Sequence, residues 1–276
     1  MIYFESHAHP DHPLVEDKHE YICAMRKSGI GKLVVAPTTY DSNYSSMEFF
    51  PGDEYPDVFF AKGIHPKYAQ NEICVQGESL AQGEFLWPKK ELERFTALLK
   101  SPRVVAIKSG LDFCQKNAKE EQIQRQYDFL KMFMDMAYEH HKPLVLHIRN
   151  AAEEAIDFFR VNPIRVPAEV HCFTYDKDIM QLYINVGIKY FGIGGMITRD
   201  DNDMLCEAVL EMPLEMILLE SDAPFVKVHG ETQKINTSDR SIPVVAKKIA
   251  QIKGISEEEV AKVTYNNACK FFNLKE

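Results

Sequence analysis

The sequence predicts a single α/β domain over residues 1–276: a (β/α)8 barrel of the TIM type, completed by C-terminal helices. Short β-branched runs alternate with longer amphipathic stretches, which is the pattern of repeated βα units. Residues able to bind metal recur near the ends of these runs, and the carboxyl ends of the strands in a parallel barrel meet on one face. A chain of 276 residues has a common length for one such barrel.

Eight runs are predicted to be strands: 2–7, 32–37, 57–64, 103–108, 143–147, 167–172, 188–194 and 216–222. Helices are expected between them, near 15–29, 42–49, 89–100, 119–141, 151–160, 177–186 and 201–211. From about Ser241 the tail predicts two or three helices, and Ser256 before three glutamates is typical of a capped helix start.

Two glycine-containing segments are expected at the barrel mouth. Residues 65–88 contain two glycines and two prolines without a clear period, and they predict a long loop that forms a lid or a substrate wall. The run Gly192-Ile193-Gly194-Gly195 lacks the spacing of a nucleotide-binding motif. We expect its glycines where backbone segments approach closely.

The composition restricts the partners. A net charge of −9 gives no broad attraction for a nucleic-acid backbone, so extended duplex binding is not expected. A short strand end could still enter a pocket whose positive charge comes mainly from metal ions. The six cysteines form no CxxC pair, and no leader peptide or membrane-spanning run is present, so we expect a cytoplasmic protein.

Potential metal-binding residues form a repeated pattern. Side chains along a strand alternate between its two faces, so His7 and His9, two residues apart, point the same way. They can therefore hold one ion. A single histidine is more often a core or surface residue, but several suitable residues at successive strand ends indicate a metal site. The six positions are His7, His9, Lys108, His147, His171 and Asp222. The other histidines are expected to be solvated: His12, His19, His140, His141 and His229.

Six motifs in this order resemble those of the TatD-family metal-dependent hydrolases, which are amidohydrolase-type barrels. The resemblance covers essentially the whole chain, and the motifs are specific together although each is weak alone. They are Phe4-Glu5-Ser6-His7-Ala8-His9, Gly63-Ile64-His65-Pro66, Gly110-Leu111-Asp112-Phe113, Leu146-His147-Ile148-Arg149-Asn150-Ala151, Val170-His171-Cys172-Phe173 and Leu219-Glu220-Ser221-Asp222-Ala223-Pro224-Phe225.

The resemblance implies a metal centre. His7, His9 and Asp222 would hold a first divalent ion, and His147 and His171 a second. Imidazole and carboxylate ligands suit Zn²⁺ or Mn²⁺, and Mg²⁺ less well. Such ions activate water and polarise a phosphoryl oxygen, and Asp222 would accept the proton of the water as general base.

Further residues are implied around the substrate. His65 and Arg149 would bind it, with Arg149 either forking onto a phosphate or pairing with Asp112 or Glu220. Glu5 and Glu220 would orient imidazoles or form ordinary ion pairs. Three aromatic residues would either stack on a base or serve as packing: Tyr68, Trp87 and Phe113.

Lys108 departs from the family pattern. TatD-like sequences usually carry a glutamate there that bridges the two metals, and an ammonium group would repel both ions. A carboxylated Lys108 would be an anionic bridge. A cationic Lys108 would replace the second metal and bind a phosphate, a reading we rank slightly above the carbamate. The third reading is a degenerate site with a scaffold role only.

A second departure weakens the assignment of the substrate. Where the family typically shows Arg-Asn-Glu-Pro, this chain has the segment Asn236-Thr237-Ser238-Asp239-Arg240. The leading hypothesis is a phosphodiesterase, such as a deoxyribonuclease trimming the ends of single-stranded DNA. The alternatives are a hydrolase of a small amide, lactone or phosphoester, and a non-catalytic partner protein on the same barrel.

Overall fold

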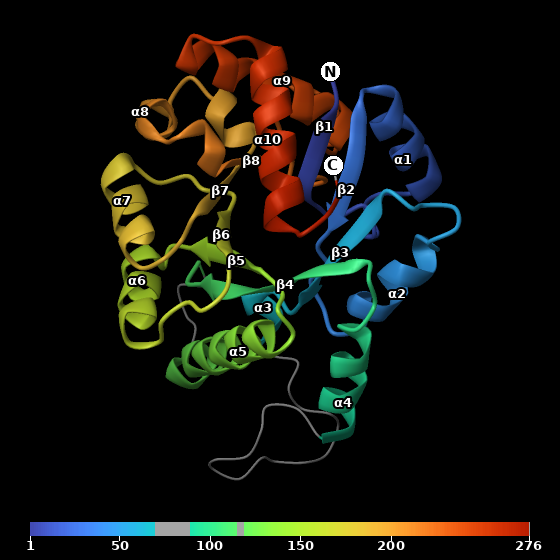
Figure 1. Ribbon diagram of the computed structural model, residues 1–276, viewed down its shortest axis with the longest axis vertical. Helices are drawn as coiled ribbons and strands as arrows, with labels where there is room; N and C mark the ends of the chain where they lie inside the picture. The colour runs from blue at the N-terminus through green and yellow to red at the C-terminus, as the bar shows by residue number, and fades with distance from the viewer. Residues whose placement is uncertain (70–88, 115–118, 276) are drawn as a thin grey trace.

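The computed structural model describes residues 1–69, 89–114 and 119–275. Eight parallel strands lie side by side in chain order, from β1 to β8, and helices surround them (Figure 1). The predicted (β/α)8 barrel is therefore confirmed. The strands are β1 Tyr3–Ala8, β2 Ile30–Val35, β3 Val58–Gly63, β4 Val104–Asp112, β5 Leu144–Arg149, β6 Ala168–His171, β7 Tyr190–Ile193 and β8 Ile217–Leu219.

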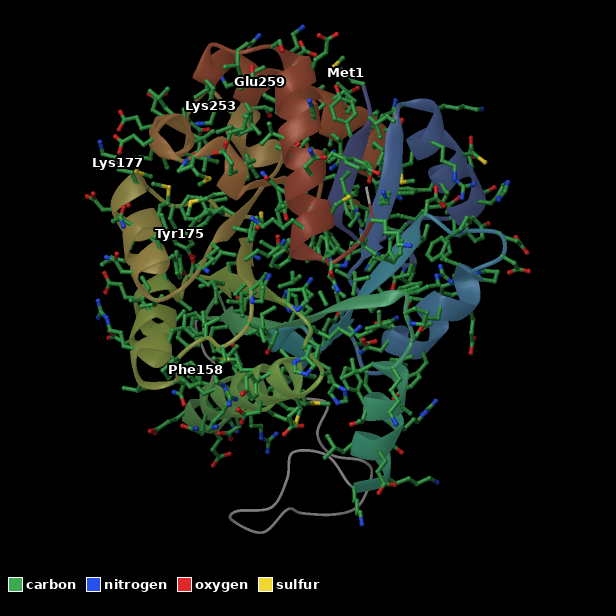
Figure 2. All side chains as sticks on the ribbon, in the orientation of Figure 1. Met1, Phe158, Tyr175, Lys177, Lys253 and Glu259 are labelled. Atoms are coloured by element: carbon green, nitrogen blue, oxygen red, sulfur yellow. The ribbon has the colours of Figure 1, made fainter. Side chains whose placement is uncertain are left out.

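The helices agree with the expected ranges to within a few residues. They are α1 Lys18–Lys27, α2 Ser42–Phe49, α3 Pro66–Ala69, α4 Lys89–Leu98, α5 Glu120–Glu139, α6 Ala152–Val161, α7 Lys177–Asn185, α8 Asp203–Glu211, α9 Ser238–Lys253 and α10 Glu257–Phe271. Two 3-10 turns, η1 Gly195–Thr198 and η2 Leu214–Met216, flank β7 and β8. Figure 2 labels Lys177 on the outer helix α7. The amino group of Lys177 pairs with the carboxylate of Glu211 on α8 at 2.8 Å.

The strands are buried on both faces, as a barrel requires. Side chains alternate along each strand, so Leu33 and Val35 of β2 join a large core shared with the helices. Val34, between them, belongs to a smaller core that Phe271 and Phe272 at the end of α10 also join. Apolar packing on both sides of each strand fixes the direction in which the polar strand-end residues point.

The seam between β1 and β8 is closed by individual hydrogen bonds, because the described residues show no ladder pairing there. The amide of Asp222 donates to the carbonyl of His7 at 3.0 Å, and the amide of His9 donates to the carbonyl of Ala223 at 2.7 Å. These bonds join segments more than two hundred residues apart. They set the backbone that carries Asp222 against His7 of β1 and His9 directly after it.

Strand β4 is longer than predicted, so the expectation that Lys108 ends a strand was wrong. The strand continues to Asp112, and Gly110 pairs with His147 of β5. A Cβ on Gly110 would lie 1.8 Å from the carbonyl oxygen of His147, so only glycine permits this close pairing. Lys108 consequently lies within the strand.

Two further expectations need adjustment. The tail forms two helices, α9 and α10, and α9 begins at Ser238 instead of about Ser241. Ser256 caps α10 as predicted, since its hydroxyl accepts the amide of Glu259 at 3.1 Å. The expected loop 65–88 begins with the short helix α3, and residues 70–88, with Trp87, lie outside the described residues. No helix in the described part of the chain is long and apolar enough to span a bilayer.

Candidate metal centre

A cavity of about 700 Å³ opens at the carboxyl ends of the strands. Its wall contains most of the residues singled out from the sequence: His9, His65, Lys108, His147, Arg149, His171 and Asp222. His7 lies directly behind them, fully buried, with Nε2 2.7 Å from the Lys108 amino group. The structure therefore brings all the predicted positions together at one barrel mouth.

His7, His9 and Asp222 form the first cluster. One possible ligand atom from each lies within 4.8 Å of the others, and Nε2 of His9 is 3.1 Å from Oδ1 of Asp222. Burial alone would raise the pKa of Asp222, but the hydrogen bond with His9 and the nearby imidazoles lower it to about 2. Asp222 is therefore a carboxylate at neutral pH.

His147 and His171 form the second cluster. Nδ1 of His147 lies 3.2 Å from Nε2 of His171, so these two nitrogens converge. The opposite nitrogen of each ring faces a carboxylate: Asp112 at 3.1 Å from His147 and Glu220 at 3.4 Å from His171. Burial lowers the pKa of His147 to about 4 and that of His171 to about 3, so both imidazoles are neutral and able to bind a metal.

The side chain of Lys108 lies beside the first cluster. Its amino group is 2.7 Å from Nε2 of His7, and no part of the side chain is exposed. Burial lowers its pKa to about 8, although the carboxylates of Asp222 and Glu220 oppose the shift. The resemblance implies a metal-bridging glutamate at this position. The structure instead has the amino group of Lys108 in contact with His7 of the first cluster.

Glu220 lies beside the ring of His171 in a closely fitted position, with one carboxyl oxygen 3.4 Å from Nδ1. One carboxylate oxygen accepts the amide of Cys172 at 2.6 Å. A Cβ on Gly192 would lie 2.2 Å from the other oxygen, so glycine makes room for Glu220. The close approach of backbone segments expected for these glycines is found at Gly195, where a Cβ would lie 2.9 Å from the backbone of Lys227. At Gly192 the neighbour is instead the side chain of Glu220.

Glu5 acts on the backbone and not on an imidazole. Its Oε1 accepts the amides of His7 at 3.2 Å and of Ser221 at 2.9 Å, which strengthens the seam between β1 and β8. Burial raises the pKa of Glu5 to about 8. Both glutamates were predicted either to lie beside an imidazole or to form ion pairs. Of the two, Glu220 alone lies beside an imidazole, that of His171.

The first cluster suits a divalent cation. Nδ1 of His7 and Nδ1 of His9 are buried and have no hydrogen-bond partner among the described residues. Unpartnered buried donors or acceptors are rare unless a ligand satisfies them. Two imidazoles and one carboxylate form a donor set typical of Zn²⁺ or Mn²⁺. The second cluster offers two converging imidazoles but has Lys108 where a bridging carboxylate would be needed.

His65 and Arg149 reach the cavity from the ends of β3 and β5. The ring of His65 lies 4.1 Å from that of His147, and burial lowers the pKa of His65. Among the described residues, Arg149 forms no ion pair within 4.0 Å with Asp112 or Glu220, the partners considered for a structural role. Arg149 is exposed and lines the cavity.

The sequence reasoning missed several residues of the cavity wall. His12 was expected to be solvated, but it lines the cavity and its ring lies 5.1 Å from that of Phe225. Asp112 had been considered only as a partner of Arg149. Further residues missed include Tyr175, Arg199 and Phe225. The position of Phe225 directly after Ser221-Asp222-Ala223-Pro224 was the one available signal.

The aromatic residues and the remaining histidines have separate roles. Tyr68 lines the cavity, whereas Phe113 packs against Tyr127 with ring centres 6.1 Å apart. His19 bonds the hydroxyl of Tyr55 at 3.0 Å, and His229 is exposed, 3.5 Å from Asp200. Neither histidine approaches the metal clusters.

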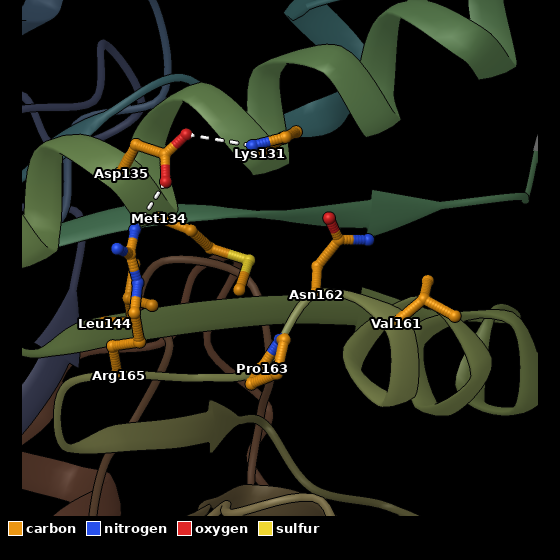
Figure 3. Close-up of a pocket in the computed structure, with 8 residues that line it drawn as sticks. All are labelled: Lys131, Met134, Asp135, Leu144, Val161, Asn162, Pro163 and Arg165. Atoms are coloured by element: carbon orange, nitrogen blue, oxygen red, sulfur yellow. Dashed lines mark hydrogen bonds and ion pairs between the residues drawn. The ribbon is translucent and has the colours of Figure 1, made fainter.

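A second cavity, of about 330 Å³, lies near Leu144 at the amino end of β5 (Figure 3). Both of its basic residues, Lys131 and Arg165, pair with Asp135 at 3.0 and 2.5 Å, as the dashed lines show. Both cations are therefore engaged by one carboxylate, and the lining contains no group of histidines and carboxylates like that of the barrel mouth.

The barrel and the two imidazole clusters at its carboxyl end define a hydrolase of the metal-dependent barrel class. Residues 4–273 match the family model described as TatD related DNase. The chain belongs to this family of metal-dependent hydrolases.

Individual relatives agree over nearly the whole length. The 3'-5' ssDNA/RNA exonuclease TatD of Edwardsiella piscicida is 26% identical, with 94% of each chain covered. The metal-dependent hydrolase YjjV of Escherichia coli K12 is 25% identical and covers 99% of this chain and 98% of its own. The crystal structure of E. coli YjjV superposes with a TM-score of 0.83 at 22% identity, covering 99% of this chain and 98% of its own, and so supports the fold.

Proposed function

We propose that this protein hydrolyses phosphodiester bonds at the ends of single-stranded nucleic acid, with one divalent cation held by His7, His9 and Asp222. The observation that carries the proposal is the first cluster, with its buried and unpartnered imidazole nitrogens, at the base of an open cavity. The exonuclease name of the relative from Edwardsiella piscicida supports the choice of substrate class.

Asp222 is proposed as the general base. A divalent cation at this position supplies electrophilic activation of the water and of the phosphoryl oxygen. Asp222 lies in the cavity wall and is ionised at neutral pH, so its free carboxylate oxygen can accept the proton of the attacking water.

Lys108 and Arg149 are proposed to bind the phosphate, together with His65. A cationic Lys108 places a positive charge beside the first cluster, where the family has a second ion, and can donate to a phosphoryl oxygen. Arg149 at the end of β5 offers a planar fork to the same group. The two side chains enter the cavity from neighbouring strands, β4 and β5.

A single-stranded end suits the charge distribution. The net charge of −9 disfavours extended duplex binding, whereas the cavity concentrates Lys67, Lys108, Arg149 and Arg199 at one opening. We also propose a cytoplasmic location, where thiols stay reduced, because no disulfide is found in the described part of the chain.

A second candidate function is hydrolysis of a small amide, lactone or phosphoester. The cavity of about 700 Å³ has the size of a small-molecule site. The segment 236–240, which follows the last strand, also differs from the family pattern.

An activity panel separates the two functions. The protein, purified without added metal, is loaded in turn with Zn²⁺, Mn²⁺ or Mg²⁺. End-labelled single-stranded DNA, the matching duplex and small esters, lactones and amides are then offered. We expect stepwise shortening of the single strand and much slower attack on the duplex. Turnover of a small ester without any shortening of the oligonucleotide would overturn the proposed function.

A further inference from the structure

Phe225 is an exposed aromatic ring at the lip of the metal cavity. It is 45% exposed, while Ala223 and Val228 on either side in the chain are at most 7% exposed. It follows the metal-cluster residue Asp222 by three positions, and its ring centre lies 5.3 Å from that of His9. A large apolar surface is thus left in contact with solvent beside the proposed reaction centre.

The backbone that carries Phe225 is fixed from several directions. The amide of Phe225 donates to the carbonyl of Asp222 at 2.9 Å. Buried Asn236 holds both neighbours, because its amide donates to the carbonyl of Pro224 at 3.1 Å and its side chain donates to the carbonyl of Val226. An exposed ring on a rigid backbone loses little further freedom when a ligand binds.

The cavity wall around the ring combines apolar surface with one cation. Met196 and Val226 line the cavity with Phe225, and Arg199 follows at the end of η1. The turn η1 packs against the chain after Val226: the amide of His229 donates to Thr198 at 2.7 Å, and a Cβ on Gly195 would lie 2.9 Å from Lys227. The two segments thus form one wall on the β7 and β8 side.

We propose that Phe225 is the stacking platform for the nucleobase of the terminal nucleotide, and that Arg199 binds a phosphate of the same strand. This inference rests on the proposed function. A nucleobase matches the ring, because aromatic side chains stack on bases of any sequence. The apolar residues beside Phe225 suit the base, whereas the phosphate-binding groups Lys108 and Arg149 belong to β4 and β5.

Fluorescence of 2-aminopurine tests the stacking directly. A phosphorothioate-protected single strand with 2-aminopurine at its terminal position is titrated with metal-loaded protein. Stacking on the ring quenches the emission, so we expect quenching with wild type and with Phe225→Tyr, and its loss with Phe225→Ala. Tyr138→Ala is the matched control, since Tyr138 is similarly exposed, at 46%, and lies on Arg165 away from the metal cavity.

Kinetics with an abasic substrate separate stacking from a general structural effect. For a normal single strand, Phe225→Ala should raise KM about 10-fold, which corresponds to the loss of one base–aromatic stack. For a strand whose terminal nucleotide lacks its base, wild type and Phe225→Ala should have equal KM values. Arg199→Ala should raise KM equally for both substrates.

The outcomes distinguish failure of the inference from failure of the proposed function. If wild type shortens oligonucleotides and Phe225→Ala retains both the quenching and the normal KM, the inference is overturned and the proposed function stands. An equal loss for normal and abasic strands overturns the inference as well, because the ring would then act on the fold. A wild type that neither cleaves the strand nor quenches 2-aminopurine overturns both.

Discussion

The amino group of Lys108, within β4, lies 2.7 Å from Nε2 of His7, one of the residues in the first cluster. The contact joins the one departure from the family's ligand pattern to the first metal cluster. As an ammonium group, Lys108 contributes a positive charge to phosphate binding. As a carbamate, it is an anion that can bridge two metal ions. The two states predict different metal contents.

Replacement of Lys108 by glutamate tests the cationic state. If Lys108 is an ammonium, Lys108→Glu should raise the bound metal from one ion towards two per chain, because it restores a bridging carboxylate beside His147 and His171. Phosphodiester hydrolysis at saturating metal should increase. Elemental analysis of the purified variant measures the first effect, and Lys108→Gln controls for the loss of charge alone.

The carbamate predicts the opposite behaviour of wild type. Native protein should then hold two ions, lose activity when CO₂ is removed, and recover it on addition of bicarbonate. Intact mass spectrometry would detect the added carboxyl group. Two bound ions without a carbamate or a bicarbonate response would contradict both states of Lys108.

Removal of the proposed base should abolish turnover. Asp222→Asn keeps the shape of the side chain but cannot accept the proton of the water, so kcat should fall at least 100-fold. Circular dichroism should remain unchanged, and metal content must be measured because Asp222 is also a proposed ligand. Asp200→Asn is the control, since Asp200 is exposed and pairs with His229, away from the metal clusters. Wild-type turnover by metal-loaded Asp222→Asn would refute the assignment.

Arg149 is predicted to act on substrate binding. Arg149→Ala should raise KM about 10-fold with little change in kcat, because a fork onto the phosphate is lost in the bound substrate and in the transition state alike. Arg165→Ala, which removes an arginine at the amino end of the barrel, should leave both constants unchanged. An unchanged KM for Arg149→Ala would assign Arg149 to the fold.

The buried imidazoles predict a pH-dependent stability difference in metal-free protein. Histidine titrates near 6.5 in the unfolded chain, whereas His147 stays neutral in the fold down to about pH 4. Below pH 6.5 the unfolded state therefore binds more protons, and the contribution of His147 to the free energy of unfolding falls. Between pH 7.5 and 5 the loss is about 2 kcal/mol.

Comparison with His147→Gln isolates this contribution. Glu5, whose pKa burial raises to about 8, acts in the opposite direction over the same range, so the pH profile of wild type alone is not diagnostic. The difference in unfolding free energy between wild type and His147→Gln should shift by about 2 kcal/mol towards the variant at pH 5. A constant difference between wild type and His147→Gln across this pH range would show that His147 is not buried as a neutral ring.

Much of the fold could be predicted because the chain repeats one simple pattern. Short apolar runs alternate with amphipathic stretches, and each such βα unit buries its apolar surface only against neighbouring units in a closed barrel. This alternation located the eight strands. It also indicated that His7, His9, His147, His171 and Asp222 would meet, because parallel strands end on one face. The departure at Lys108 was also evident from the sequence, because the resemblance to the TatD family implies a glutamate two residues before Gly110-Leu111-Asp112.

The tertiary structure alone decided how these side chains pair. That Asp112 faces His147, and that Glu220 lies against Gly192, depends on the register of neighbouring strands, which pairs Gly110 with His147. The exposure of Phe225 depends on Asn236, eleven residues further on, holding both sides of the turn. Local sequence fixes backbone preference and the face of each side chain. Distances between side chains are set by contacts between segments that are distant in the chain.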